Sequence, residues 1–275
     1  WQAYNFHSTF HNAFYYEDTP QRLIMKSHET DAEMDMAIEF MRKQREAKQP
    51  FFLMVAPHPP HPPWKPQDCP AGYLEQIRQD LIWDPNVPQD HRLRQNPLPA
   101  RCYYAMAKNF DDAFGRLLDS LDKSGLSENT IVVLTADHGD MLGSHGRQNK
   151  MVPYREAVNV PCVIRWPGRI RAGQRIDVLV TPMDHFPTLC GLVGLQAPST
   201  CDGVDLSGAL LGTRRIDRDA VLMANYVSHW DFFDSGTNWP EWRGVRTERY
   251  TYAKWLDGKE ELYDNVEDPY QMKNL

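Results

Sequence analysis

The sequence of 275 residues lacks several features that would by themselves assign it to a class of protein. Its five cysteines are odd in number and have no close paired spacing, which indicates neither a disulfide framework nor a zinc cluster. The longest apolar run, Phe51 to Ala56, has six residues, whereas a membrane-spanning helix needs about 20. Lys and Arg number 30 against 37 Asp and Glu, and the net charge of −7 argues against a surface for nucleic acid or anionic lipid. Repeats and low-complexity tracts are also absent, so we expect an ordinary globular chain.

The spacing of apolar residues predicts alternating helices and strands over most of the chain. Thr30 to Glu33 matches a capping box, and an apolar stripe with helical spacing follows it. A second helix is predicted over about 100–123. The continuously apolar segments Phe51 to Ala56 and Thr130 to Thr135 suit strands buried on both faces. The order strand, helix, strand is typical of a βαβ unit, so we expect an α/β fold with a mixed, largely parallel sheet flanked by helices.

The chain after residue 160 contains shorter predicted elements, and its pattern changes near residue 215. Shorter strands are predicted at 160–165 and 177–181, with a helix at 184–193. After about residue 215, Val, Tyr and Trp alternate with charged residues, which is typical of an antiparallel sheet with one face in water. We therefore expect an α/β domain over residues 1–215 and a small antiparallel α+β subdomain over residues 216–275.

The strongest local signal for chemistry is Ala136-Asp137-His138-Gly139-Asp140, directly after a predicted strand. Ligands of open α/β sheets bind beyond the carboxyl ends of the strands. Asp137 offers carboxylate oxygens and His138 an imidazole nitrogen to a divalent cation, and Gly139 permits the turn that would bring both to one ion. The alternative is that Asp137 only caps a turn and His138 is solvated.

Two further segments could contribute to such a site. Lys150 lies in a polar loop 13 residues after Asp137, and near a metal it would neutralise a tetrahedral oxyanion, although an isolated loop lysine is usually a solvated charge. The Pro-rich segment after Phe51 to Ala56 displays His58 and His61 with little freedom, because proline fixes the backbone. A rigidly held histidine suits a general acid, although the segment could equally be an ordinary surface loop.

These motifs resemble those of the type I sulfatases, which belong to the alkaline-phosphatase-like superfamily. The resemblance covers most of residues 30–275 and is carried by ordered motifs: Asp137 to Asp140, then Gly146, Lys150, Tyr154-Arg155-Glu156, Trp166-Pro167-Gly168, Gly244-Val245-Arg246-Thr247, Glu261 to Asp264 and Glu267-Asp268-Pro269. By this resemblance Asp137 and His138 are metal ligands, with Ca²⁺ as the expected ion. Lys150 matches the lysine that binds the sulfate, and His61 matches the histidine that binds sulfate and protonates the leaving group. His58 and His145 are assigned no role.

The sulfatase nucleophile is a formylglycine made from a C/S-x-P/A-x-R segment, and none of the five cysteines lies in such a segment. The paired acidic metal ligands of the family's N-terminal part are missing too, and the sequence begins at Trp1. We therefore expect the C-terminal portion of a sulfatase, with an α/β sheet incomplete at its N-terminus. In isolation it should bind metal weakly or not at all and turn over no substrate. Either the missing half or another copy of the chain should cover the exposed sheet edge.

The function implied is hydrolysis of an organic sulfate ester, from a small molecule or a sulfated glycan. A phosphonate monoester or phosphodiester hydrolase of the same superfamily is the alternative within enzymes. A non-catalytic binding module on the same scaffold is the alternative from another class, although an idle site would have no need to keep all four residues. Neither nucleic acid nor membrane is expected as a partner. The resemblance makes a periplasmic or secreted location plausible, and the sequence itself does not determine it.

Overall fold

The computed structural model describes residues 2–3, 9–226 and 241–275, and it divides the chain into two units. Unit 1 comprises Trp1–Trp83 and Gln89–Thr130, and unit 2 comprises Asp84–Pro88 and Ile131–Leu275. Residues 131–215 and 216–275 thus belong to the same unit by their internal contacts. The predicted domain boundary at residue 215 stays a prediction.

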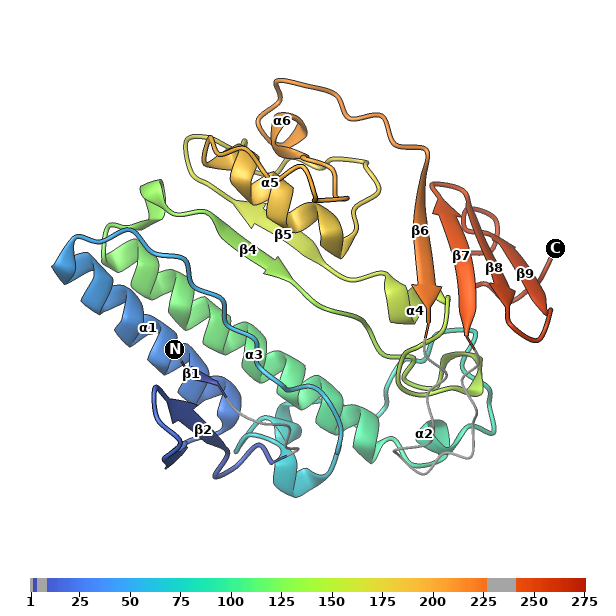
Figure 1. The fold of residues 1–275 in the computed structure, drawn as a ribbon. Coiled ribbons are helices and arrows are strands. Elements are labelled where there is room, and N and C mark those ends of the chain that lie inside the picture. The colour runs from blue at the N-terminus through green and yellow to red at the C-terminus, as the bar shows by residue number, and fades with distance from the viewer. Residues whose placement is uncertain (1, 4–8, 227–240) are drawn as a thin grey trace. The chain divides into compact units, whose positions relative to one another are not determined.

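Two long helices form the framework of unit 1. Helix α1 spans Glu29–Ala47 and helix α3 spans Leu98–Lys123, and the two pack side by side (Figure 1). Arg116 of α3 bonds Asp31 of α1 at 2.9 Å, and Asn109 donates to the same carboxylate at 3.2 Å. Both helices confirm the predictions made from the apolar spacing. The shorter elements of unit 1 are β1 (Gln2–Ala3), β2 (Phe14–Glu17), β3 (Arg22–Ile24), α2 (Arg92–Gln95) and the 3₁₀ turns η1 (Pro66–Asp68), η2 (Leu74–Gln76) and η3 (Ser127–Asn129).

The start of α1 differs from the predicted capping box. The helix begins one residue earlier, at Glu29, and its N-cap is His28, whose side chain makes no capping hydrogen bond. Thr30 therefore lies inside the first turn, where its side chain is fully buried. The capping-box prediction was wrong because burial of this turn, rather than a hydroxyl cap, sets where the helix begins.

The segment 51–56 is not the fully buried strand that was predicted. It runs outside any assigned strand, and its side chains alternate, with Phe52 78% and Met54 77% exposed. An apolar run is buried on both faces only when strands flank it and helices cover it. Within residues 2–3, 9–226 and 241–275, no strand pairs with this segment.

The first sheet of unit 2 has two strands and is antiparallel. Strand β4 (Val132–Thr135) pairs with β5 (Cys162–Arg165), with Val132 opposite Arg165 and Thr135 opposite Cys162. All strand pairs in the described part of the chain are antiparallel, so the prediction of a largely parallel sheet was wrong for these residues. The chain returns from β4 through a polar loop and the single turn α4 (Arg155–Val158), not through a long helix across the sheet, so β5 runs back along β4.

The remaining helices of unit 2 follow β5. The 3₁₀ turn η4 (Ser144–Gly146) lies in the loop after β4, and η5 (Pro182–Asp184) leads into α5 (His185–Leu192), which confirms the helix predicted there. Helix α6 spans Ser207–Leu210. Residues 177–181, predicted as a strand, are irregular.

The C-terminal sheet confirms the predicted antiparallel pattern. Strands β6 (Ala220–Asn225), β7 (Trp242–Thr247), β8 (Tyr250–Trp255) and β9 (Glu260–Asp264) lie in sequence order, as Figure 1 shows. Gly258, with φ +91°, makes the turn between β8 and β9. One face of the sheet packs Trp242, Ala253, Trp255 and Tyr263 against Met141, Val152, Tyr154 and Ala157. This packing anchors both ends of the loop that carries Lys150.

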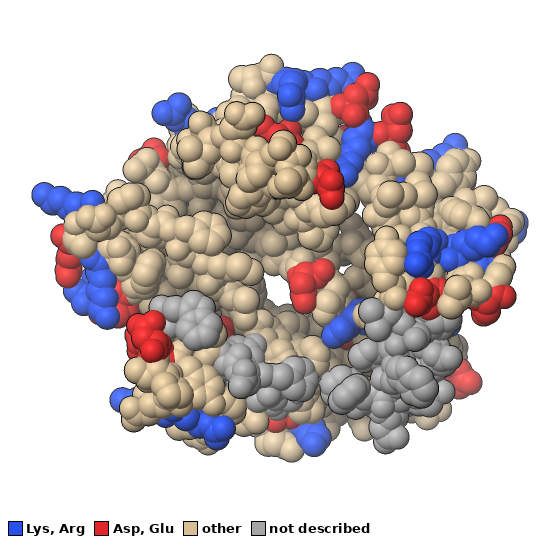
Figure 2. All heavy atoms as spheres, viewed as in Figure 1, with Lys and Arg blue, Asp and Glu red and all other residues tan. Residues whose placement is uncertain are grey.

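The surface agrees with the charge balance of the sequence. Figure 2 shows acidic and basic side chains interspersed on the face in view. None of the described helices combines the length and the apolar character that crossing a bilayer would require.

Candidate functional site

Asp137 and His138 lie in the turn that follows β4. The His138 amide donates to Asp137 Oδ1 at 2.9 Å, and the His138 Nε2 lies 3.3 Å from Asp137 Oδ2. The Asp137 side chain is 86% exposed. The turn is held by Gly139, whose amide donates to the Ala157 carbonyl at 2.9 Å, and a Cβ on Gly139 would collide with the backbone carbonyl of Glu156. The backbone approach that only glycine allows therefore fixes the place of both side chains.

Lys150 returns to the neighbourhood of this turn through the polar loop. The Met141 amide donates to the Asn149 carbonyl at 2.8 Å, which closes the loop at its base. Burial lowers the pKa of Lys150, and the negative charges of Asp140 and Asp137 oppose that shift. Burial likewise raises the pKa of Asp140 to about 6, against the Leu142 amide and the charge of Lys150. The ammonium group of Lys150 thus lies within electrostatic reach of both carboxylates.

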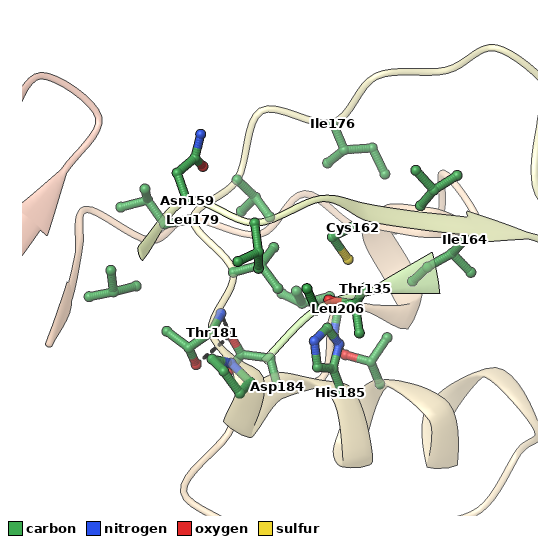
Figure 3. Close-up of a pocket in the computed structure, with 18 of the residues that line it drawn as sticks. Thr135, Asn159, Cys162, Ile164, Ile176, Leu179, Thr181, Asp184, His185 and Leu206 are labelled. Atoms are coloured by element: carbon green, nitrogen blue, oxygen red, sulfur yellow. Dashed lines mark hydrogen bonds between the residues drawn. The ribbon is translucent and has the colours of Figure 1, made fainter. Parts of the chain in front are cut away.

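Asp137, His138 and Lys150 line one cavity of about 1630 Å³ in unit 2. Figure 3 shows part of its wall, with Thr135 from β4, Cys162 and Ile164 from β5 and His185 from the start of α5. Much of this wall is apolar. A polar group of one cation, one carboxylate and one imidazole beside such a wall is an arrangement that can bind an anionic group.

His61 lies in unit 1, in the loop after residues 51–56. Its amide donates to the His58 carbonyl at 3.0 Å, and its ring stacks on that of His58 with centroids 4.7 Å apart. Its Nδ1 lies 2.8 Å from the Pro62 carbonyl, so Nδ1 carries the hydrogen of the neutral ring and Nε2 its lone pair. Trp64 Nε1 donates to the Pro60 carbonyl at 2.8 Å and braces the loop. The approach of His61 to Asp137, which the resemblance implies, stays a prediction.

The two residues that the resemblance predicts as metal ligands would not by themselves complete a divalent cation site. Asp137 and His138 would supply one carboxylate and one imidazole, whereas Ca²⁺ takes about 6–8 oxygen ligands. Over the part of the chain that the structure describes, no group of three or more His, Cys, Asp or Glu side chains is arranged to hold a metal ion. A complete cation site would therefore need oxygen ligands from outside these residues.

Asn86 is a structural residue of the site that the sequence did not indicate. Its Nδ2 lies 2.8 Å from Glu156 Oε1, 3.2 Å from His145 Nε2 and 3.2 Å from the Tyr270 carbonyl. The His145 ring also stacks on Tyr154 at 4.2 Å. These contacts connect the loop before Lys150 to the C-terminal segment. His145 therefore has a structural role in this loop. No spacing rule could have found this cluster, because its members are up to 184 residues apart.

The aromatic residues between 226 and 242 could stack on sugar rings or pack the subdomain. Trp230, Phe232, Phe233 and Trp239 lie outside the described residues. Trp242 is buried, and its Nε1 donates to the Met151 carbonyl at 2.8 Å, so this side chain serves packing. Tyr226 is 66% exposed, and the Arg243 guanidinium lies 4.5 Å from its ring centre.

Comparison with known proteins identifies the family. Residues 2–195 match the sulfatase family, and residues 143–275 match the C-terminal region of N-sulphoglucosamine sulphohydrolase. An endo-4-O-sulfatase of Bacteroides thetaiotaomicron is 30% identical over all of this chain and 58% of its own length. An ulvan-active sulfatase of Formosa agariphila is 32% identical over all of this chain and 53% of its own length. The chain belongs to the sulfatase family, a family of hydrolases.

A solved structure confirms the fold. A 4S-sulfatase from a study of glycosaminoglycan metabolism in Bacteroides thetaiotaomicron superposes on all of this chain and 60% of its own, with a TM-score of 0.90 and 29% identity. The alkaline-phosphatase-like sulfatase fold expected from the motifs is thereby confirmed. The chain spans about half the length of the curated relatives it matches.

Proposed function

We propose that this chain forms part of a sulfatase that releases sulfate from a sulfated glycan, and that the nucleophile comes from outside these 275 residues. Lys150 carries the proposal, because its half-buried ammonium group lines the same cavity as Asp137 and His138 in a chain of the sulfatase family. The close relatives named above include sulfatases of polysaccharides, which supports a glycan as the substrate class.

Lys150 would bind the sulfuryl oxygens of the ester. Attack on sulfur forms one new S–O bond and breaks the S–O bond to the sugar, and negative charge develops on both the sulfuryl oxygens and the departing oxygen. A cation in a partly apolar cavity stabilises such charge more than the same cation in water, because the local dielectric constant is lower. The lowered pKa of Lys150 has the same origin, since burial penalises its charge until an anion is bound.

His61 would donate a proton to the departing sugar oxygen. Its Nδ1 is directed to the Pro62 carbonyl, so the proton that moves is the one on Nε2 of the imidazolium. The proline-rich backbone and the Trp64 brace hold the ring in place. General acid catalysis by a positioned histidine contributes about 10²–10⁴-fold to a rate. Asp137 and His138 would provide two of the ligands of a divalent cation, which supplies charge stabilisation when it is bound.

The proposal is tested with Lys150→Ala in a longer form of the chain that includes a nucleophile segment. Sulfate release from a sulfated disaccharide, measured by ion chromatography, should fall by about 10²–10³-fold, as expected for loss of an oxyanion-stabilising group. Lys254→Ala is the matched control, because Lys254 is a half-exposed lysine of unit 2 that pairs with Glu260 at 2.7 Å and should leave the rate unchanged. Full activity of Lys150→Ala, or turnover of a phosphonate monoester in place of every sulfate ester offered, would overturn the proposal.

A further inference from the structure

The loop that carries His61 contacts helix α1 through Glu29, a residue that the sulfatase motifs do not include. Glu29 is fully buried at the first turn of α1. Its Oε1 accepts the His58 amide hydrogen at 3.4 Å. Its own amide donates to the Phe10 carbonyl at 2.8 Å, so the backbone of Glu29 is fixed from the other side. A buried charged or polar side chain is retained where its contact has a role, because burying it is costly.

A chain of contacts leads from Glu29 to the His61 ring. Phe10, which is 1% exposed, meets the His58 ring edge-on at 5.5 Å between centroids. The His58 ring stacks on the His61 ring at 4.7 Å, with an interplanar angle of 26°. The hydrogen bond from the His61 amide to the His58 carbonyl closes the turn between them. His58 is thus held at its amide by Glu29, and its ring contacts both Phe10 and His61.

We propose that Glu29 is a positioning residue for His61, acting through the His58 amide and the stacked His58 ring. The inference rests on the proposed role of His61 as the proton donor. It accounts for a feature that the prolines leave open: they stiffen residues 57–63 internally, but they do not determine where the loop is attached to the rest of unit 1. Glu29 supplies that attachment.

The side chain of Glu29 is suited to this task by its length. Glutamine has the same length and retains an oxygen that accepts a hydrogen bond, whereas aspartate keeps the charge but is one methylene shorter. If position matters, Glu29→Gln should resemble the wild type and Glu29→Asp should not. If charge alone matters, Glu29→Asp should resemble the wild type and Glu29→Gln should not.

The first test measures amide hydrogen exchange by NMR in the 275-residue chain. Glu29→Asp and Glu29→Ala should each accelerate exchange of the His58 amide by about tenfold, the effect of losing its hydrogen bond to the Glu29 side chain. Exchange of the His61 amide should accelerate as well, because the His58 carbonyl that it bonds is then less firmly held. Glu29→Gln should stay within threefold of the wild type. Glu39→Asp and Glu39→Ala are the matched controls, because Glu39 is an exposed glutamate of the same helix that bonds Arg42. Unchanged exchange at 58 and 61 in Glu29→Asp, with α3 amides still protected, would refute the inference even if Glu29→Ala did not fold.

The second test separates positioning from a general loss of structure. In the longer, active form, Glu29→Asp should slow hydrolysis of a sugar sulfate about tenfold, while hydrolysis of 4-nitrophenyl sulfate, whose leaving group needs no proton, should stay within twofold. Equal loss on both substrates would mean that Glu29 only supports the fold. The two proposals can fail separately. If the Glu29 variants alter amide exchange but the longer form hydrolyses no sulfate ester, the contact between Glu29 and His58 stands and only the proposed function is refuted.

Discussion

At the scale of single residues, burial shifts the pKa of two glutamates of helix α1 far from the ordinary value. Glu33 lies one helical turn after Glu29 on α1, and both carboxyl groups are withdrawn from water. Burial raises the pKa of Glu29 to about 7. Burial, reinforced by the neighbouring Glu29, raises the pKa of Glu33 to about 8. On the same helix, the Glu39 side chain is half-exposed and bonds Arg42, so the two glutamates six residues apart have different surroundings.

The raised pKa of Glu33 makes the stability of this chain dependent on pH. Between the ordinary value of 4.5 and about 8, the folded chain holds a proton that the unfolded chain has released, so the free energy of unfolding falls as pH rises. Glu33→Gln removes the titration and should stabilise the chain at pH 8 by on the order of 2 kcal/mol, with no gain near pH 4.5. Urea unfolding of both proteins from pH 4.5 to 8 measures the difference.

Glu39→Gln provides the control for this comparison. Glu39 is exposed, and its hydrogen bond to Arg42 lowers its pKa, so its substitution should have an effect that is constant between pH 5 and pH 8. A gain from Glu33→Gln that does not grow with pH would show that the carboxyl group is not buried as described.

At the scale of the elements, the turn between β4 and α4 positions the candidate site. Two backbone contacts define it: the hydrogen bond from the Gly139 amide to Ala157 and the close approach of Gly139 to the Glu156 carbonyl. The sheet β6–β9 then packs on the segment 141–157 through its aromatic face. The conformation of the loop carrying Lys150 therefore depends on an antiparallel sheet about a hundred residues further along the sequence.

Gly139→Ala tests this arrangement against a glycine that makes no close contact. The added methyl group would overlap the Glu156 carbonyl oxygen, so the variant should lose about 1–3 kcal/mol of stability, as overpacked sites do. Gly115 lies inside α3 with open space around it, so Gly115→Ala should instead gain about 0.5–1 kcal/mol. Urea unfolding followed by tryptophan fluorescence measures the change in the free energy of unfolding for both variants. Equal effects of the two substitutions would contradict the close approach at residue 139.

At the scale of the whole molecule, three observations bear on the expectation that this chain functions together with further sequence. Apolar side chains of extended segments are exposed, among them Phe52, Met54 and Val163. Among the described residues, no three or more His, Cys, Asp or Glu side chains are grouped to hold a metal ion, whereas a calcium site needs about six or more ligands. Relatives extend over nearly twice the length matched here. We propose that the remainder of a sulfatase domain, or a second copy of the chain, covers these exposed apolar side chains.

Calcium binding by the isolated chain is accordingly expected to be weak. Titration calorimetry should give a Kd no tighter than about 1 mM, since one exposed carboxylate and one imidazole leave most of the coordination shell to water. Asp137→Asn should leave the heat of titration nearly unchanged. The isolated chain should also release no sulfate from sulfate esters. Stoichiometric binding below 10 µM that Asp137→Asn abolishes would refute this expectation.

The sequence by itself determined the helices α1 and α3, the antiparallel C-terminal sheet, the family and the four candidate residues. These follow from short-range periodicity and from motifs whose members are close along the chain. The largely parallel pairing of the sheet, the start of α1 and the burial of residues 51–56 were predicted wrongly, because each depends on which segments lie beside them. Only the tertiary structure revealed the contact of Glu29 with His58 and the cluster around Asn86. Such contacts join residues 29 to 184 positions apart, and no local pattern in a sequence encodes which distant side chain a buried polar group will meet.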